Sequence, residues 1–193
     1  MYAPCGCCGL GCNGSHLIDF GSMLLDDRPR YVVAQMEDLG VPNPRGKQFR
    51  DPGGYGIIIM QKGNRIFFEM GESIGVTGPI IVMCEKGRVI MDGGTKTVVA
   101  EARRKEDFNA PVTKLGLPLE KIYTSSFELD VVECSRSALE NLLSGKTIVS
   151  DVDKGIESLK AIAAFYFSNK RGTALIDLDR LTEEEIETRF SFT

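Results

Sequence analysis

A hairpin pattern lies in the first half of the chain, where residues 57–70 read IIIMQKGNRIFFEM. Two apolar runs, at 57–60 and 65–70, flank the turn Lys62-Gly63-Asn64. Glycine and asparagine tolerate the positive φ that a tight hairpin turn requires, so the two runs can pair directly. The stretch therefore predicts two neighbouring strands of an antiparallel sheet.

The same pattern continues on both sides of this hairpin. Short β-branched or aliphatic runs occur at 31–36, 80–84, 89–91 and 97–102. Glycine turns at 86–87 and 92–94 separate the later runs, and we expect them to supply positive φ so that consecutive runs pair as a meander. Residues 40–56 form a long loop, which is compatible either with a cover over a binding cleft or with disorder.

Helical patterns flank the predicted strands. Leu17, Ile18, Leu24 and Leu25 recur at helical spacing, with Asn13 or Ser15 as the capping residue and an end at 26–29. A capping-box pattern at 125–128 predicts a second helix with an apolar stripe at 129, 132, 139, 142 and 143, ending at Gly145. A third helix is expected from about Asp151 to 170–172, a strand at 174–178, and a short helix after a capping box at 182–185.

This order of elements predicts an α+β fold, with a mostly antiparallel open β-sheet and helices packed on one face. A length of 193 residues with 42% hydrophobic content favours one domain over residues 1–193. Within it, we expect residues 1–12 to be an irregular lead rich in cysteine and glycine, and residues 180–193 to be a terminal helix or tail.

Composition also argues against several partners and cofactors. The formal net charge of −4, with acidic and basic residues mixed along the chain, predicts no nucleic-acid partner. No apolar stretch approaches the roughly 20 residues of a membrane span, and no secretory signal is visible, which favours a cytoplasmic location. Residues 6–14 are glycine-rich, but we expect no strand before them, hence no dinucleotide fingerprint and no cofactor bound by this chain.

Four of the six cysteines cluster at the start of the chain: Cys5, Cys7, Cys8 and Cys12. Four thiolates are enough for a zinc site or an iron-sulfur cluster. The adjacent pair at 7 and 8 cannot easily direct both thiolates to one ion, and no C-x-x-C spacing occurs. We therefore expect no metal site, and thiols that are free or partly oxidised.

Residues 9–19 read GLGCNGSHLID, which resembles the G-x-x-x-(D)-x-G-x-H-x-x-D segment that opens the second domain of the glucose-fructose oxidoreductase/inositol dehydrogenase (Gfo/Idh/MocA) family. The resemblance continues through Arg28-Pro29 and the following run, the hairpin ending at 85–89, and the two predicted helices between 127 and 172. The shared order of these segments, rather than any one of them, makes the match specific.

The resemblance implies a function as well as a fold. Members of the family are two-domain NAD(P)-dependent oxidoreductases that act on sugars, polyols or related carbonyl compounds. An N-terminal Rossmann domain carries the cofactor and the catalytic lysine, and the C-terminal domain lines the substrate site and forms homodimers through its sheet. No counterpart of the Rossmann domain is visible, so we expect a substrate-binding and oligomerisation domain. The alternative is a non-enzymatic dimeric module that binds a ligand or a protein.

The resemblance assigns the candidate site to one segment. His16, the chain's only histidine, matches the residue that exchanges a proton with the substrate hydroxyl, and an imidazole can do so near neutral pH. The paired aspartate four residues earlier is Cys12 here. Asn13 can hydrogen-bond a polyol, and Asp19 matches a second acidic position that holds the helix. The competing interpretation of His16 is a surface or capping residue near a helix start.

Overall fold

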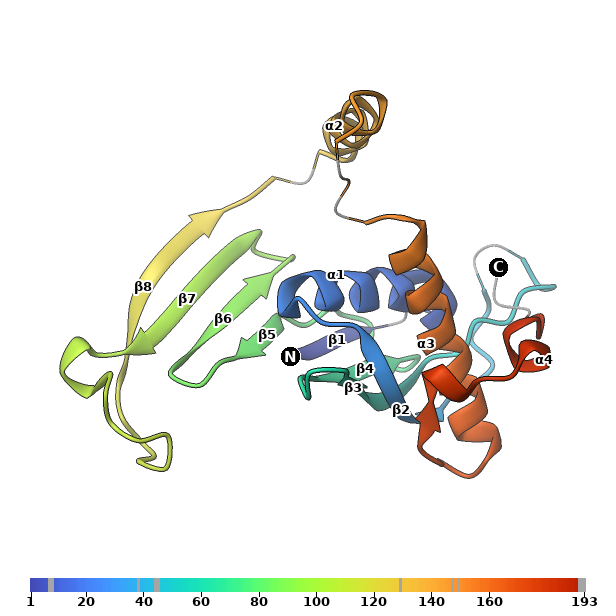
Figure 1. The fold of residues 1–193 in the computed structure, drawn as a ribbon, viewed down its shortest axis with the longest axis horizontal. Coiled ribbons are helices and arrows are strands. Elements are labelled where there is room, and N and C mark those ends of the chain that lie inside the picture. Colours follow the sequence, from blue (N-terminus) through green and yellow to red (C-terminus); the bar gives the residue numbers. More distant parts are fainter. Residues whose placement is uncertain are drawn as a thin grey trace.

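The computed structural model describes residues 1–6, 9–37, 39–43, 46–128, 130–146, 148 and 150–190. Within these residues, nine strands form one open sheet in the order β8-β7-β6-β5-β1-β4-β3-β2-β9 (Figure 1). The strands are β1 (Tyr2–Gly6), β2 (Pro29–Met36), β3 (Gly54–Met60), β4 (Arg65–Gly71), β5 (Ile80–Met83), β6 (Gly87–Asp92), β7 (Thr97–Arg103), β8 (Leu119–Ser126) and β9 (Ile176–Asp177). All neighbours pair antiparallel except β1 and β4, which are parallel. The predicted α+β class is confirmed.

Two helices cover one face of the sheet. The helices are α1 (Ser15–Leu25), α2 (Val131–Leu143), α3 (Val152–Lys170) and α4 (Glu183–Ile186), and a π turn, η1 (Leu10–Gly14), precedes α1. Figure 1 shows α1 and α3 across strands β1–β4, with α2 away from them. Every second residue of the central strands, such as Ile58 and Phe68, is buried with Ile18 of α1 and Phe165 of α3. Every residue of α2 is described, and none is buried.

The expectation of an irregular lead is wrong for residues 2–6, which form β1 inside the sheet. Tyr2 lies opposite Phe67 of β4 on one side and Ile81 of β5 on the other, and Ala3 is fully buried. β1 therefore separates β4 from β5, so these two consecutive strands do not pair directly. The rest of the expected meander, β2–β3–β4 and β5–β6–β7, is confirmed. Cys7 and Cys8 lie outside the described residues.

The turns follow the predicted chemistry only in part. Gly63 has φ +91 in the β3–β4 turn, as expected. In the β6–β7 turn the residue with positive φ is Lys96 (φ 53) instead of Gly93 or Gly94. Gly87 begins β6, where a Cβ would lie 2.2 Å from the carbonyl oxygen of Glu101. Close approach of the neighbouring strand, rather than positive φ, explains this glycine.

The helix starts show one error and two confirmations. Ser125 and Ser126 belong to β8, so the capping pattern at 125–128 does not begin a helix. α2 starts instead after Asp130, whose side chain accepts a hydrogen bond from the Glu133 N–H. α3 follows Asp151 and α4 has the expected capping box at 182–185, inside the predicted terminal segment. Leu129, expected in the α2 stripe, and residues 191–193 lie outside the described residues, and the expected strand at 174–178 is shorter, Ile176–Asp177.

Candidate functional site

The structure places all four predicted site residues on one continuous segment. Cys12 and Asn13 lie on the η1 turn, and His16 and Asp19 lie in the first turns of α1. The His16 side chain is exposed, whereas the other three are partly buried. His16 and Asp19 are three residues apart, so they lie on the same side of α1. The Cys12 thiol donates to the Asn13 side-chain oxygen at 3.9 Å.

The expected cap of this helix is wrong. In the described structure neither Asn13 nor Ser15 caps α1 through its side chain, because the helical path already begins at Leu10 with the π turn. The Ser15 hydroxyl instead donates to the carbonyl oxygen of Cys12 at 3.0 Å. The helical path that leads to His16 therefore begins at Leu10, before either of the predicted capping residues.

Asp51, which the sequence analysis missed, lies at this earlier start. Its Oδ1 accepts from the Gly11 N–H at 2.7 Å, and its Oδ2 accepts from the Cys12 N–H at 2.9 Å. The neighbouring carbonyl of Pro52 accepts from the Leu10 N–H at 3.2 Å. A carboxylate at a helix N-terminus both satisfies free N–H groups and interacts favourably with the helix dipole. Asp51 is 39 residues from Cys12, so no local sequence signal connects the two.

Two further residues bear on the Asp51 carboxylate. A Cβ added to Gly9 would lie 2.1 Å from Asp51 Cγ and Oδ2, so any side chain there would displace the carboxylate. On the α3 side, burial and secondarily the negative charge of Asp51 raise the pKa of Tyr166.

The loop that contains Asp51 is held at both ends. The Glu72 carboxylate accepts from the Leu39 N–H at 2.9 Å and from the Gly53 N–H at 3.0 Å. The Glu37 N–H donates to the Gly53 carbonyl at 3.0 Å, which closes the loop at its base. The loop ends at residue 53, three residues before its predicted end, because β3 begins at Gly54.

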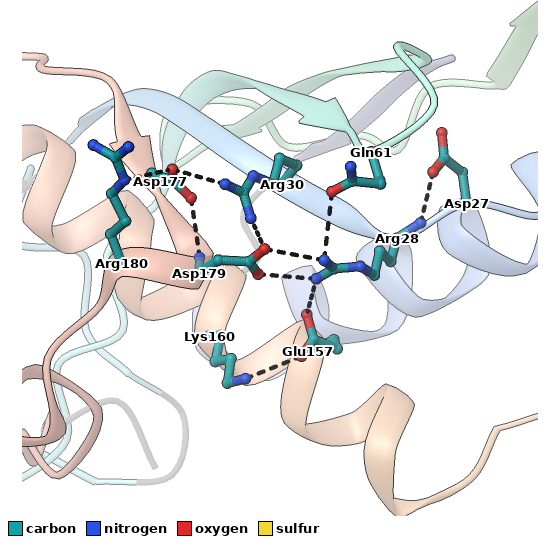
Figure 2. A network of polar contacts seen from close by, with 9 residues as sticks. All are labelled: Asp27, Arg28, Arg30, Gln61, Glu157, Lys160, Asp177, Asp179 and Arg180. Atoms are coloured by element: carbon teal, nitrogen blue, oxygen red, sulfur yellow. Dashed lines mark hydrogen bonds and ion pairs between the residues drawn. The ribbon is translucent and has the colours of Figure 1, made fainter.

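A second feature, at the far end of α1, is a cavity of about 700 Å³. Its lining includes Met23, Asp26 and Lys62, and also Arg28 and Glu157. Figure 2 shows that these last two belong to a charged network: Arg28 pairs with Asp179 at 3.0 Å and with Glu157 at 3.7 Å. Arg30 of β2 also pairs with Asp177 of β9 at 2.9 Å. The charges compensate one another and join β2 and the residue before it to α3, to β9 and to the turn after β9, which is a structural role for them.

Two other kinds of site are absent from the described residues. Among these residues, no three His, Cys, Asp or Glu side chains are grouped so that they could hold a metal ion. Within the same part of the chain, no helix has both the length and the apolar composition needed to cross a membrane. The cysteine cluster as a whole is untested, because two of its members lie outside the described residues.

Comparison with known proteins places this geometry in a known fold. No protein-family profile matches the sequence, and no curated protein matches it significantly. Solved structures do match: an NAD-binding protein from Listeria innocua at TM-score 0.62 and 15% identity, and an NAD binding oxidoreductase from Klebsiella pneumoniae at 0.63 and 14%. The match covers 91% and 88% of this chain but 57% and 50% of theirs.

The chain has the fold of the C-terminal domain of Gfo/Idh/MocA-type oxidoreductases. An aldose-aldose oxidoreductase from Caulobacter crescentus, solved with glycerol, shares this fold at TM-score 0.59 and 17% identity. The match covers 85% of this chain and 45% of the aldose-aldose oxidoreductase. The chain thus spans about half the length of the oxidoreductases that it resembles.

Because some of these similar structures are described as NAD-binding, we asked whether this domain could itself hold a dinucleotide. Residues 9–14 read GLGCNG, they follow β1 and they open a helix, so the expectation of no glycine fingerprint after a strand is wrong. The surroundings nevertheless do not fit the cofactor. In a dinucleotide site the pyrophosphate binds the N–H groups at the helix start, and the next strand pairs with the first. Here Asp51 binds those N–H groups, and β1 pairs with β4 and β5.

Proposed function

We propose that this chain is the substrate-binding and oligomerisation domain of an NAD(P)-dependent oxidoreductase that acts on a sugar, a polyol or a related carbonyl compound. The fold carries the proposal, because it matches solved NAD-binding oxidoreductases over about nine-tenths of the chain. NAD or NADP would bind to a cofactor domain outside these 193 residues and accept the hydride there.

The residues at the start of α1 suit the proton transfer that such a reaction needs. Oxidation of an alcohol requires removal of its hydroxyl proton as the hydride leaves the carbon. His16 offers an exposed imidazole for this proton, and Asn13 offers an amide for a neighbouring hydroxyl group. The Asp19 carboxylate, one turn further along α1, supports the helix rather than the chemistry.

The coding sequence upstream of Met1 tests the proposal most directly. We expect it to encode a cofactor domain, with a strand, G-x-G-x-x-G and a helix, followed by an E-K-P-type lysine segment. The same domain encoded by a separate gene, whose product copurifies with this chain, would also support the proposal. A genome with neither would rule out the oxidoreductase proposal and leave the non-enzymatic dimeric module.

The oxidoreductase domain and the alternative non-enzymatic module would both form a homodimer. The face of the sheet that α1 and α3 leave uncovered supports this homodimer. One row of neighbouring residues crosses five strands on this face: Val33, Ile57, Phe67, Tyr2 and Ile81. Phe67 is 46% exposed. A continuous apolar surface of this kind is typical of a protein interface, and a second copy offers a self-complementary partner.

Replacing Phe67 by glutamate should convert the dimer to a monomer, because the change places a charge in the centre of this apolar row. Sedimentation velocity over a range of concentrations measures the effect. The matched control is Leu24→Glu, at a similarly exposed position on α1, which should leave the dimer intact. A wild-type chain that stays monomeric at high concentration would contradict the dimer.

We also expect no saturable binding of NADH or NADPH to this chain, with any affinity weaker than about 1 mM. The reason is that Asp51 would repel a pyrophosphate from the only glycine-rich helix start among the described residues. Fluorescence titration of NADH and NADPH measures this affinity. Micromolar binding would show that the glycine-rich turn is a cofactor site after all.

A further inference from the structure

The first N–H groups of a helix have no partner within the helix, so each needs an acceptor from elsewhere. Outside acceptors are present for the first three residues of the helical path that carries His16. The Leu10 N–H donates to Pro52, and the Gly11 and Cys12 N–H groups donate to Asp51, whereas the Asn13 N–H makes the first bond within the helix, to the Gly9 carbonyl. The loop between β2 and β3 therefore supplies all three outside acceptors.

We propose that Asp51 is a positioning residue for the candidate site: a built-in anion that occupies the glycine-rich helix start and fixes the helix carrying His16. The inference deepens the proposed function and rests on it for the role of His16. Glycine-rich helix starts attract anions because several N–H groups and the helix dipole converge on one point. Here the anion belongs to the chain itself.

The packing around the carboxylate explains why this acceptor is specific. Gly9 allows Asp51 to approach closer than any side chain at position 9 would permit. Tyr166 of α3 lies near enough for the charge of Asp51 to influence it, in a part of the molecule where burial reduces screening by water. Charged acceptors form the stronger hydrogen bonds, and partial burial strengthens them further.

The base of the loop provides a way to separate two effects: loosening of the loop, and loss of the contact between Asp51 and the helix of His16. Glu72 holds the loop ends through the Leu39 and Gly53 N–H groups, which lie outside the helix of His16. Glu72→Gln keeps an acceptor oxygen at this position, so it loosens the loop base while Asp51 remains. If Asp51 acts through its own contact, Glu72→Gln should change the His16 helix far less than a change at Asp51.

The test compares Asp51→Ala, Asp51→Asn and the wild type by amide hydrogen exchange of Gly11 and Cys12. We expect exchange about tenfold faster in Asp51→Ala, because loss of a capping side chain has an effect of this size. Asp51→Asn keeps one oxygen acceptor and should be intermediate. The imidazole proton resonance of His16, the only histidine, should shift or broaden in the same order.

Rescue by acetate is a second readout. Acetate would not restore the protection of the two amides if Asp51→Ala had caused a general loss of packing. At about 0.1 M it should slow exchange of the two amides in Asp51→Ala, since a free carboxylate can occupy the vacated N–H groups. Chloride at the same ionic strength is the control and should not do so. Absence of any acetate effect would overturn the anion role.

Gly9→Ala tests the position of the Asp51 carboxylate without changing Asp51 itself. Its Cβ would displace the Asp51 carboxylate, so the two amides and the His16 resonance should change as in Asp51→Ala. Gly155→Ala is the matched control, because among the described residues that Cβ would meet no atom within 4 Å apart from its chain neighbours and the backbone of its own helix. Unchanged exchange in both Asp51→Ala and Gly9→Ala, with a native circular dichroism spectrum, would overturn the inference. None of these measurements needs a substrate, so that result would leave the proposed function open to its own tests.

Discussion

Replacing His16 by alanine in the proposed intact oxidoreductase should lower kcat/KM by about 10²- to 10⁴-fold, the contribution usual for a general base or acid. The effect should fall mainly on kcat, because the role proposed for the imidazole is proton transfer rather than holding the substrate. His16 is exposed in the isolated domain, so its loss should not change the unfolding temperature. Steady-state kinetics with a panel of sugars and polyols, alongside thermal unfolding, measure both quantities.

The matched control is Met23→Ala, on the same helix but at its other end, where the side chain is also exposed. It should leave kcat/KM unchanged. If His16→Ala retained full turnover on a substrate that the parent enzyme converts, the proton-transfer role of His16 would have to be abandoned. Loss of turnover in both variants would point instead to a general disturbance of α1.

The candidate site shows where sequence reasoning succeeds and where it stops. His16, Cys12, Asn13 and Asp19 are within a few residues of one another, so one motif places them together. Asp51 contributes through contacts with Gly11 and Cys12 that span 40 and 39 residues of sequence. Its own neighbourhood predicts only a loop. The folded sheet, which returns the chain from β2 to β3 beside the helix start, is what brings it to the site.

The elements of the fold also divide into those set by local signals, which could be predicted, and those set by distant strand pairing, which could not. The β3–β4 hairpin and α3 could be predicted because their signals, Gly63 in the turn and Asp151 at the cap, act within a few residues. β1 could not, since its five residues contain a proline and no β-branched side chain, and its partner strand lies more than 60 residues away. At 125–126 the pairing of β8 with β7 prevailed over a local capping pattern, so the chain stayed extended there.

Replacing Phe165 by alanine should lower the free energy of unfolding by about 3–5 kcal/mol, the usual range for an aromatic side chain removed from a core. Phe165 is 0% exposed, and its ring packs edge-to-face on Phe68 of β4 with centroids 5.5 Å apart. A small domain has about 5–15 kcal/mol of stability in total, so this loss is a large fraction of it. Urea denaturation at fixed protein concentration measures the change.

The matched control is Phe108→Ala, because Phe108 is 47% exposed and should cost less than about 1 kcal/mol. The comparison also bears on the site. α3 packs against α1 and the η1 turn, so a loosened α3 should speed exchange of the Gly11 and Cys12 amides. Equal losses of stability in the two phenylalanine variants would contradict a core centred on α3 and β4. Faster exchange of the two amides in Phe165→Ala alone would show that this core supports the His16 helix.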